Sequence, residues 1–428
     1  MKIPSLISLY FTLSLAPLLA VPVEVSVESA VELASRASVE LYGQKLAVES
    51  AQRDLGNSWN LFLPGISMGL SAKTGDKFLA PAILGNSGPG FGSTLSLGTK
   101  LTLTSGVLYD LEKQRTSLRS ALLEERDLKA RLARDVQKAY FQLVSLQLEL
   151  ENKAKAIVLA EERRRLADLR FARGLGSELD ALRAQMSELN ARSAHKKAVS
   201  DYDKRQTAFR RQLGLAAGDQ LRLTTALEVP AVQPADVIAT LIDTRIDLAK
   251  ASLARKIAAV ATAKFINLNR LPLVTLDAGW SFSLADFKTS RDNFSISASL
   301  SFNADAWIPG SRKDLELLAL RETEDRLARS HEQIRRSALD EVEALRLDLE
   351  FARNSLELAS GQISLSERIA ARTREAWERG AATALELEDA QYAVDSAKQT
   401  LIASQYQYLS LLIDLGYALN TDWKTLYK

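Results

Sequence analysis

The stretch from Leu273 to Trp307 alternates apolar residues with small polar ones at a period of two, which is the period of an extended β-strand. Its apolar positions are Val274, Leu276, Ala278, Trp280, Phe282 and Leu284, and then Phe294, Ile296, Ala298, Leu300 and Phe302. A polar segment, 286–293, separates the two runs, and the alternation resumes after it in phase. The stretch predicts a β-hairpin, 273–304, with one apolar and one polar face.

A second pair of alternating runs lies earlier in the chain, on either side of a loop rich in glycine and proline. Its apolar positions are Ile66, Met68, Leu70 and Ala72, and then Leu95, Leu97, Leu101 and Leu103. These runs predict a hairpin at 65–104, with the segment Gly85–Gly90 as an exposed loop. A soluble antiparallel sheet needs further elements to cover its apolar face, whereas lipid covers the wall of a membrane barrel.

The apolar side chains of both hairpins are therefore predicted to face lipid. The set comprises Met68, Leu70, Leu95, Leu97, Leu101, Leu276, Trp280, Phe282, Ile296, Leu300 and Phe302. Four strands cannot close a barrel with a lumen, because closed membrane barrels begin at about eight strands. Several copies of the chain must combine, and the strand count alone leaves their number open.

The N-terminus predicts export. Lys2 precedes an apolar run, 6–19, and the small residue Ala20, which is typical of a secretory signal peptide at 1–20. The alternative is a transmembrane anchor, but the run is shorter than the ~20 residues that a spanning helix needs. The exported chain has no other long apolar run, so any membrane span in it must be made of strands.

Apolar residues three and four positions apart predict long helices around both hairpins. One helix is expected at 27–63, ended by Pro64, and another at 248–271, ended by Pro272. A tract from 108 to 173 contains no proline or glycine and carries a coiled-coil seam formed by Leu132, Val136, Ala139, Leu143, Leu146, Leu150, Ile157 and Ala160. At ~1.5 Å per residue such a helix reaches about 100 Å, far beyond a globular core.

The two halves of the chain repeat one plan. The pairs that recur at the same spacing are Arg173-Gly174 with Arg379-Gly380, and Ala184-Gln185 with Ala390-Gln391. In each half a sharp turn, 173–180 or 379–386, ends the long helix and begins a return helix with a capping box. Arg170 suits the negative end of the first long helix. The chain thus divides into repeat 1 (21–215), a linker or partly ordered equatorial belt (216–235) and repeat 2 (236–428).

These features together resemble the TolC-like outer-membrane efflux proteins, and the resemblance covers nearly the whole mature chain. Its most specific marks are the two turns with their return helices and the strand pairs entered by Leu63-Pro64 and Leu271-Pro272. The resemblance implies an α+β membrane protein and a homotrimer, in which each chain gives four strands to one β-barrel and its helices continue the barrel into the periplasm. Such a duct passively conducts substrates of a tripartite efflux or type I secretion system, received from an inner-membrane pump through a periplasmic adaptor.

The resemblance also assigns roles at the two turns. Acidic residues just beyond them contribute to a periplasmic gate, which implies Asp180, Glu386 and Asp389, and an aromatic at Trp377 narrows it. The family has an arginine two residues after the second glycine, where this chain has Ala382. For Asp180 and Glu386, helix capping is the structural alternative. Because the turns lie farthest from the strands, we expect them to dock the adaptor through Gly174, Leu175, Gly176, Gly380 and Ala381; the alternative is that these small residues only close the turns.

The sequence gives no reason to expect an enzyme, a cofactor, a metal or a nucleic-acid partner. The chain has no cysteine, its formal net charge is +2, and neither a phosphate-binding glycine loop nor a metal-ligand spacing occurs. Its two histidines, His195 and His331, are expected to be plain surface residues. A periplasmic coiled-coil adaptor or scaffold without a channel is the alternative function. The paired amphipathic hairpins argue against it, because a soluble domain would not place so many large apolar side chains on one open face.

Overall fold

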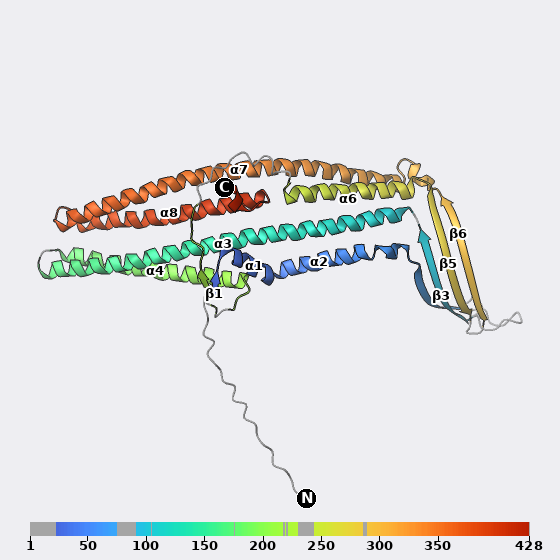
Figure 1. The fold of residues 1–428 in the computed structure, drawn as a ribbon, viewed down its shortest axis with the longest axis horizontal. Coiled ribbons are helices and arrows are strands. Elements are labelled where there is room, and N and C mark those ends of the chain that lie inside the picture. The colour runs from blue at the N-terminus through green and yellow to red at the C-terminus, as the bar shows by residue number, and fades with distance from the viewer. Residues whose placement is uncertain are drawn as a thin grey trace, which may run out of the picture.

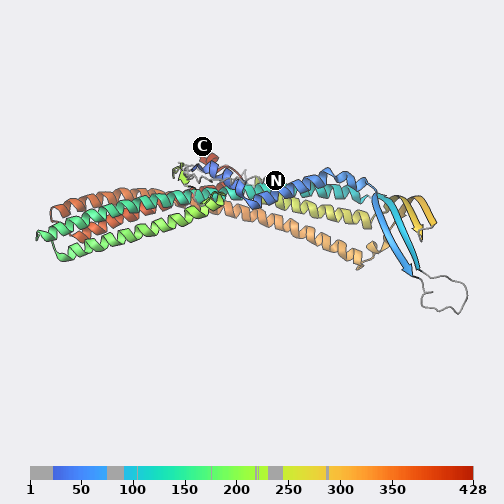
Figure 2. The same ribbon diagram turned by 90° about the horizontal axis from the view of Figure 1, so that it is seen from below.

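The computed structural model describes residues 23–74, 91–103, 105–174, 176–216, 219, 221–229, 244–285 and 289–427. The expected signal peptide (1–20), the loop Gly85–Gly90 and Leu175 lie outside the described residues. Long helices run side by side. The strands lie at one end of the molecule, and the two turns that each join a long helix to its return helix lie at the other end (Figure 1; Figure 2). The turns that the sequence places farthest from the strands do lie there.

The helices fall into two matching sets, one in each half of the chain. They are α1 (Val27–Ala37), α2 (Val39–Gly56), α3 (Gly106–Ala172), α4 (Glu178–Gln212), α6 (Ile246–Asn269), α7 (Arg312–Glu378) and α8 (Ala384–Ala418). The helices α3 and α7 have 67 residues each, and the return helices α4 and α8 have 35 each. These equal lengths reproduce the internal repeat. Among the described residues, no helix is both long and apolar enough to cross a membrane.

The helix predicted at 27–63 is in fact two helices and a short turn. Ser38 is extended, with φ −72° and ψ 111°, and its hydroxyl accepts a hydrogen bond from the backbone N–H of Leu41 at 3.2 Å, so it caps α2. After α2 the chain forms a 3₁₀ turn, η1 (Ser58–Phe62). The single-helix prediction was wrong because the apolar spacing continues across one residue that leaves the helical conformation, and periodicity does not detect such a break.

The four long strands form one antiparallel sheet. They are β2 (Gly65–Thr74), β3 (Phe91–Leu103), β5 (Leu273–Ala285) and β6 (Thr289–Ser301), in the order β2-β3-β5-β6. Strand β6 begins within the segment 286–293 that was expected to be a loop, because Thr289 pairs with Ala285. Backbone pairing continues through polar residues after the apolar alternation has stopped, and this explains the difference. A 3₁₀ turn, η4 (Ala304–Trp307), follows β6.

The register of the sheet places the predicted lipid-facing residues on a single face. Leu97 lies opposite Met68 on one side and Phe282 on the other, and Trp280 lies opposite Phe294. Directly opposite residues in an antiparallel pair share a face. The other face is polar and carries an ion pair between Lys100 and Asp277 at 3.4 Å.

The main core lies midway along the helices, where α1, α3, α4 and α8 meet two short strands. These strands, β1 (Val23–Val25) and β4 (Leu221–Leu223), pair in parallel. The hydroxyl of the buried Tyr140 donates to the carbonyl of Val25 at 3.0 Å and accepts from the N–H of Thr225 at 2.8 Å. The segment expected as a linker, 216–235, therefore contributes a strand that closes this core.

Candidate functional site

The two turns at the far end of the helices are built on glycines with left-handed backbone conformations. Gly174 has φ 69° and Gly380 has φ 77°. The N–H of Gly380 donates to the carbonyl of Trp377 at 3.0 Å, and that of Ala381 to the carbonyl of Ala376 at 2.8 Å. This pair of bonds is a Schellman motif, which satisfies the last carbonyls of α7. The next residue, Ala381, is exposed and its own backbone does not require glycine.

Two of the predicted gate carboxylates cap their own helices. The Ser177 hydroxyl donates to Asp180 at 2.7 Å, and the Asp180 N–H donates back to that hydroxyl at 3.1 Å. Thr383 donates its backbone N–H and its hydroxyl to Glu386 at 2.7 and 3.0 Å. These bonds hold the pKa of the exposed Glu386 below its usual value. The capping alternative therefore describes the local structure at both positions.

Asp389 differs from these two carboxylates. It lies on α8 one helical turn beyond Glu386, is exposed, and makes no hydrogen bond or ion pair within the described part of the chain. Residues three apart lie on the same side of a helix, so Glu386 and Asp389 present two carboxylates on adjacent turns. Of the three predicted acidic residues, only Asp389 has no local structural role.

Trp377 has a partner that the sequence did not reveal. The guanidinium of Arg170, in the last turn of α3, lies 3.8 Å from the centroid of the Trp377 ring on α7. This is the distance of a cation–π contact, and it connects the ends of the two helical hairpins. The sequence explained Arg170 only through the helix dipole, because the two residues are far apart in the chain. The cation that contacts Trp377 thus comes from the first hairpin, whereas the resemblance implies one at the position of Ala382.

A buried carboxylate fastens the first hairpin. Glu188 on α4 is 3% exposed and lies 2.8 Å from Arg164 of α3 and 2.7 Å from Arg192 of α4. Arg192 also pairs with Glu161 of α3 at 2.9 Å. Sequence reasoning missed this cluster, because charged residues are frequent throughout both helices. It binds α4 to α3 about two to four helical turns from the glycine turn, so it stabilises the turn's position.

The apolar face of the sheet is open in the single chain. Ile66 is 82% and Ile296 73% exposed, and Leu97, Trp280 and Phe302 are also exposed, while Phe282 is half-buried. Monomeric soluble proteins rarely expose a continuous apolar surface of this kind. The face is therefore a second candidate interaction surface, at the opposite end of the molecule from the glycine turns.

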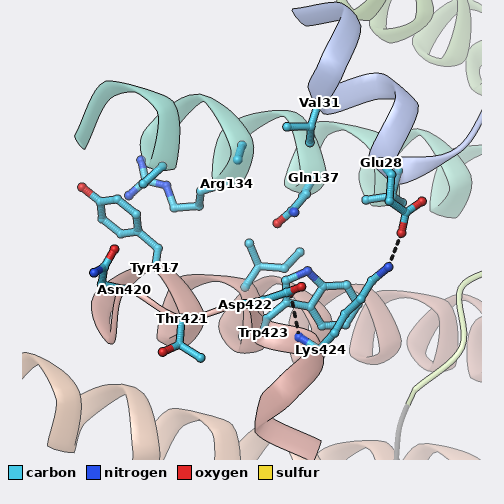
Figure 3. Close-up of a pocket in the computed structure, with 15 residues that line it drawn as sticks. Glu28, Val31, Arg134, Gln137, Tyr417, Asn420, Thr421, Asp422, Trp423 and Lys424 are labelled. Carbon is cyan, nitrogen blue, oxygen red and sulfur yellow. Dashed lines mark hydrogen bonds and ion pairs between the residues drawn. The ribbon is translucent and has the colours of Figure 1, made fainter. Parts of the chain in front are cut away.

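A cavity of about 450 Å³ lies at the level of the main core, between α1, α3, α8 and the C-terminal 3₁₀ turn η5 (Trp423–Tyr427) (Figure 3). Lys424 donates to Glu28 across its mouth, and this contact holds the pKa of Glu28 below its usual value. The Arg134 guanidinium lies 4.5 Å from the centroid of the Tyr417 ring. The Lys424–Glu28 contact fastens the C-terminal turn to α1, and the Arg134–Tyr417 contact joins α3 to α8. These groups do not form a nucleophile–base arrangement.

Within the described ranges, no group of three or more His, Asp and Glu side chains is placed to hold a metal ion. His195 lies on α4 and His331 on α7, and both side chains are partly exposed, in line with the expected surface positions.

Comparison with known proteins identifies the family. The sequence profile of the outer membrane efflux proteins matches residues 31–215 and 237–421, that is, both repeats. No curated protein matches the sequence.

The solved structures show the same fold. CusC is 17% identical, with a TM-score of 0.77 and 92% of each chain covered. The CmeC outer membrane channel of Campylobacter jejuni is 14% identical, with a TM-score of 0.77, and 93% of this chain and 88% of that one are covered. The MtrE outer membrane channel of Neisseria gonorrhoeae, in its open state, is 16% identical, with a TM-score of 0.75 and coverage of 92% and 89%. The chain belongs to the outer membrane efflux protein family, as a non-enzymatic efflux channel of the outer membrane that extends into the periplasm.

Proposed function

We propose that the chain is the passive duct of a tripartite efflux or type I secretion system, and that three copies form one continuous barrel and tunnel. The observation that carries this proposal is the open apolar sheet. Its edge strands, β2 and β6, run in opposite directions, since each neighbour in the order β2-β3-β5-β6 is antiparallel. The β2 strand of a second copy can therefore extend β6 in the same antiparallel pattern, and repetition closes a barrel without edges.

The helices support lateral assembly as well. Exposed apolar residues follow one side of α4, at Leu179, Leu182, Met186 and Leu189, and one side of α7, at Leu347, Phe351, Leu358, Leu365 and Ile369. Phe351, Leu358 and Leu365 are seven residues apart, the period of a coiled-coil seam. A seam of this kind needs a partner helix, and a neighbouring copy supplies one. The resemblance to TolC-like proteins favours three copies over other numbers.

Native mass spectrometry of the detergent-extracted protein tests the assembly. We expect a complex of three chains, which forms discrete conductance steps in planar bilayers. Monomers that produce no conductance at any voltage would instead favour the alternative function, a periplasmic scaffold without a channel. Two or four chains with conductance would keep the duct and correct the number of copies.

The proposed organisation within the chain has two repeats, 21–215 and 236–428, joined by the equatorial segment 216–235 and preceded by a signal peptide, 1–20. The two ranges matched by the family profile, 31–215 and 237–421, support this division. The equal lengths of α3 and α7, and of α4 and α8, support it independently. N-terminal sequencing of the mature protein tests the signal peptide, and a mature chain that begins at Met1 would remove it.

The glycine turns are proposed as the surface that the periplasmic adaptor meets, with Gly174, Leu175, Gly176, Gly380 and Ala381 as its members. Ala381 is exposed and its backbone tolerates any side chain, so Ala381→Trp adds bulk without breaking the turn. We expect crosslinking to the adaptor and export to fall. Leu385→Trp is the control, because Leu385 is exposed on α8 and the change keeps an apolar side chain. Ala384→Trp, just inside α8, is less suitable. Unchanged crosslinking in Ala381→Trp would remove the docking role.

The periplasmic gate is proposed at Asp180, Trp377, Glu386 and Asp389. In a trimer each inward carboxylate forms a ring of three like charges, which attracts cations and resists anions. Asp389 has no cap to make, so we expect Asp389→Asn to lower cation selectivity in bilayer recordings more than Asp180→Asn does. Equal and negligible effects of both changes would place the selectivity elsewhere in the duct.

A further inference from the structure

The polar face of the sheet carries little charge at the end that meets the helices. Of the side chains that the structure describes on this face, only Lys100 on β3 and Asp277 on β5 are charged. Lys100 lies three residues before the end of β3, and Asp277 four residues after the start of β5. The uncharged positions around them are Gly65, Ser67, Gly69, Ser71, Ser96, Gly98, Thr275, Gly279, Asn293, Ser295, Ser297, Ser299 and Ser301.

The small residues around this pair form a surface with little capacity to bind a solute. Ser67 donates its hydroxyl to the carbonyl of Gly98 at 3.3 Å, and Ser96 donates its hydroxyl to the carbonyl of Gly69 at 3.2 Å. Each hydroxyl has one proton to donate, and here the sheet uses it. Glycine adds no side chain at all. Any preference for charge on the described part of this face therefore depends on Lys100 and Asp277.

The two charged side chains differ in exposure although they form an ion pair. The Lys100 ammonium lies 3.4 Å from the Asp277 carboxylate, but the lysine side chain is 69% exposed and the aspartate only 24%. Lys100 stands between Gly65 on β2 and Gly279 on β5, and neither glycine has a side chain to cover it. The inner strands β3 and β5 have both neighbours within the chain, so pairing with a second copy leaves this arrangement unchanged. The ammonium group thus projects from the face while the carboxylate is largely covered.

An exposed ion pair contributes little to stability, so stabilisation of the sheet does not explain this pair. Resting on the duct proposed above, we propose that Lys100 and Asp277 form a charge ring near the helix end of the barrel, in which the exposed ammonium groups favour anionic over cationic solutes. Each copy adds one lysine and one aspartate to the ring, and rings of charged side chains select ions by sign. This ring has the opposite sign to the acidic residues proposed at the periplasmic gate, so the two ends of the duct select for different charges.

Reversal potentials of the full-length assembly in planar bilayers test the ring. We expect Lys100→Gln to raise the ratio of K⁺ to Cl⁻ permeability by about two- to fivefold at ~0.1 M salt, for charges ~10 Å from the solute and a Debye length of ~10 Å. At ~1 M salt, where the Debye length is ~3 Å, the difference should nearly vanish. Asp277→Asn should lower the ratio by a smaller factor, because the carboxylate is largely covered. Ser297→Gln, opposite Asp277 on the same face, adds a glutamine without removing a charge and should leave the ratio unchanged.

A thiol at the same position tests the sign of the charge within one folded protein. The chain has no cysteine, so Lys100→Cys introduces a single thiol in each copy. A thiosulfonate reagent that carries a quaternary ammonium group replaces the lost positive charge, and it should return the permeability ratio to nearly the wild-type value. A reagent that carries a sulfonate adds a negative charge, and it should raise the ratio above that of Lys100→Gln. Mass spectrometry measures the extent of labelling in both samples.

The outcomes separate the charge ring from the duct. If the assembly conducts but Lys100→Gln leaves the permeability ratio unchanged, the ring is overturned and the duct stands. The same conclusion follows if labelled Lys100→Cys gives one ratio with both reagents. A shift in Ser297→Gln as large as that in Lys100→Gln would assign the effect to side-chain bulk, and this also overturns the ring. An assembly that conducts in none of these forms, the wild type included, contradicts the duct itself.

Discussion

The core midway along the helices and the sheet at their end are made of the same kinds of side chains, with opposite exposure. In the core, Leu409 and Leu412 are 0% exposed, whereas Ile66 and Ile296 in the sheet are largely open. Burial within the chain accounts for the first group only. The second group lies on one face of four strands and has no cover within the chain, as the lipid-facing wall proposed above requires. Apolar side chains thus indicate whether a segment packs inside the chain or against something outside it only when their exposure is known.

The largest effect is expected in the core. Leu412→Ala should lower the free energy of unfolding by about 2–5 kcal/mol, because a close-packed site is left with a cavity. Chemical denaturation in detergent, followed by circular dichroism, measures this change. Ser297→Ala, on the polar face of the sheet, is the matched control and should stay within about 0.5 kcal/mol of the wild type. Equal costs for the two variants would break the contrast between core and sheet.

The sheet should tolerate a charge on one face and reject it on the other. Arg at Ile296 or Leu97 should cost about 2–4 kcal/mol, because it places a guanidinium among lipid chains near the middle of the bilayer. Arg at Ser297, the next residue along β6, should be accepted, since it points to the opposite face. Folding titrations in phospholipid vesicles compare the three variants. If Arg at Ser297 costs as much free energy of folding as Arg at Ile296, both faces of the sheet lie in apolar surroundings.

The turns at the far end face water, so their contacts should be weaker than those of either apolar region. The Arg170–Trp377 contact joins the ends of the two hairpins and is worth about 0.5–1 kcal/mol at an exposed site. Trp377→Ala should therefore raise resting conductance in planar bilayers by about two- to fivefold, and Arg170→Gln should do nearly the same. The double variant should add little, since both changes remove one contact. Additive effects would show that the two residues act separately.

The smallest effect is expected at the cap of α8 and depends on pH. Because the pKa of Glu386 in the folded chain lies below its ordinary value of 4.5, the cap contributes fully above pH 4.5 and is lost as pH falls through the folded pKa. Hydrogen exchange at the start of α8, corrected for intrinsic rates, should therefore accelerate only as the pH falls below 4.5, the ordinary value of the carboxyl group.

Glu386→Gln provides the control, because glutamine caps without titrating. In this variant the exchange at the start of α8 should not change with pH beyond the intrinsic rates. A peptide around Leu412 should show no acceleration in either protein, since it belongs to the buried core. An identical pH response in the wild type and Glu386→Gln would assign the change to another group.

Much of this fold follows from two periodicities. The alternation at 273–302 identified strands β5 and β6 and their shared face, because side chains in a strand point to opposite sides in turn. The long helices and their turns followed from apolar spacing and from the glycines at 174 and 380. Both features depend on neighbouring residues in the sequence, so they can be recognised without knowing which distant segments pack against them.

Features set by distant partners were not predictable in this way. The end of α1 at Ser38 depends on one side chain that competes for a backbone N–H. The pairing of β1 with β4 joins short segments nearly 200 residues apart, and each is too short to show a period. The contact of Arg170 with Trp377 likewise appears only when the two hairpins lie together. At the candidate gate, the resemblance drawn from the sequence indicated Trp377 and the acidic residues. It did not indicate the contact with Arg170 that positions Trp377.

The most direct test of the proposed duct compares two adjacent residues on opposite faces of β6. The chain has no cysteine, so Ser297→Cys and Ile296→Cys each introduce a single thiol. A water-soluble, charged maleimide is applied to the assembly in phospholipid vesicles, and labelling is read by mass. A wall between lipid and a wet lumen predicts that the thiol at 297 reacts and the thiol at 296 is protected. Equal, rapid labelling at both positions would mean that the sheet stands in water, and would contradict the duct.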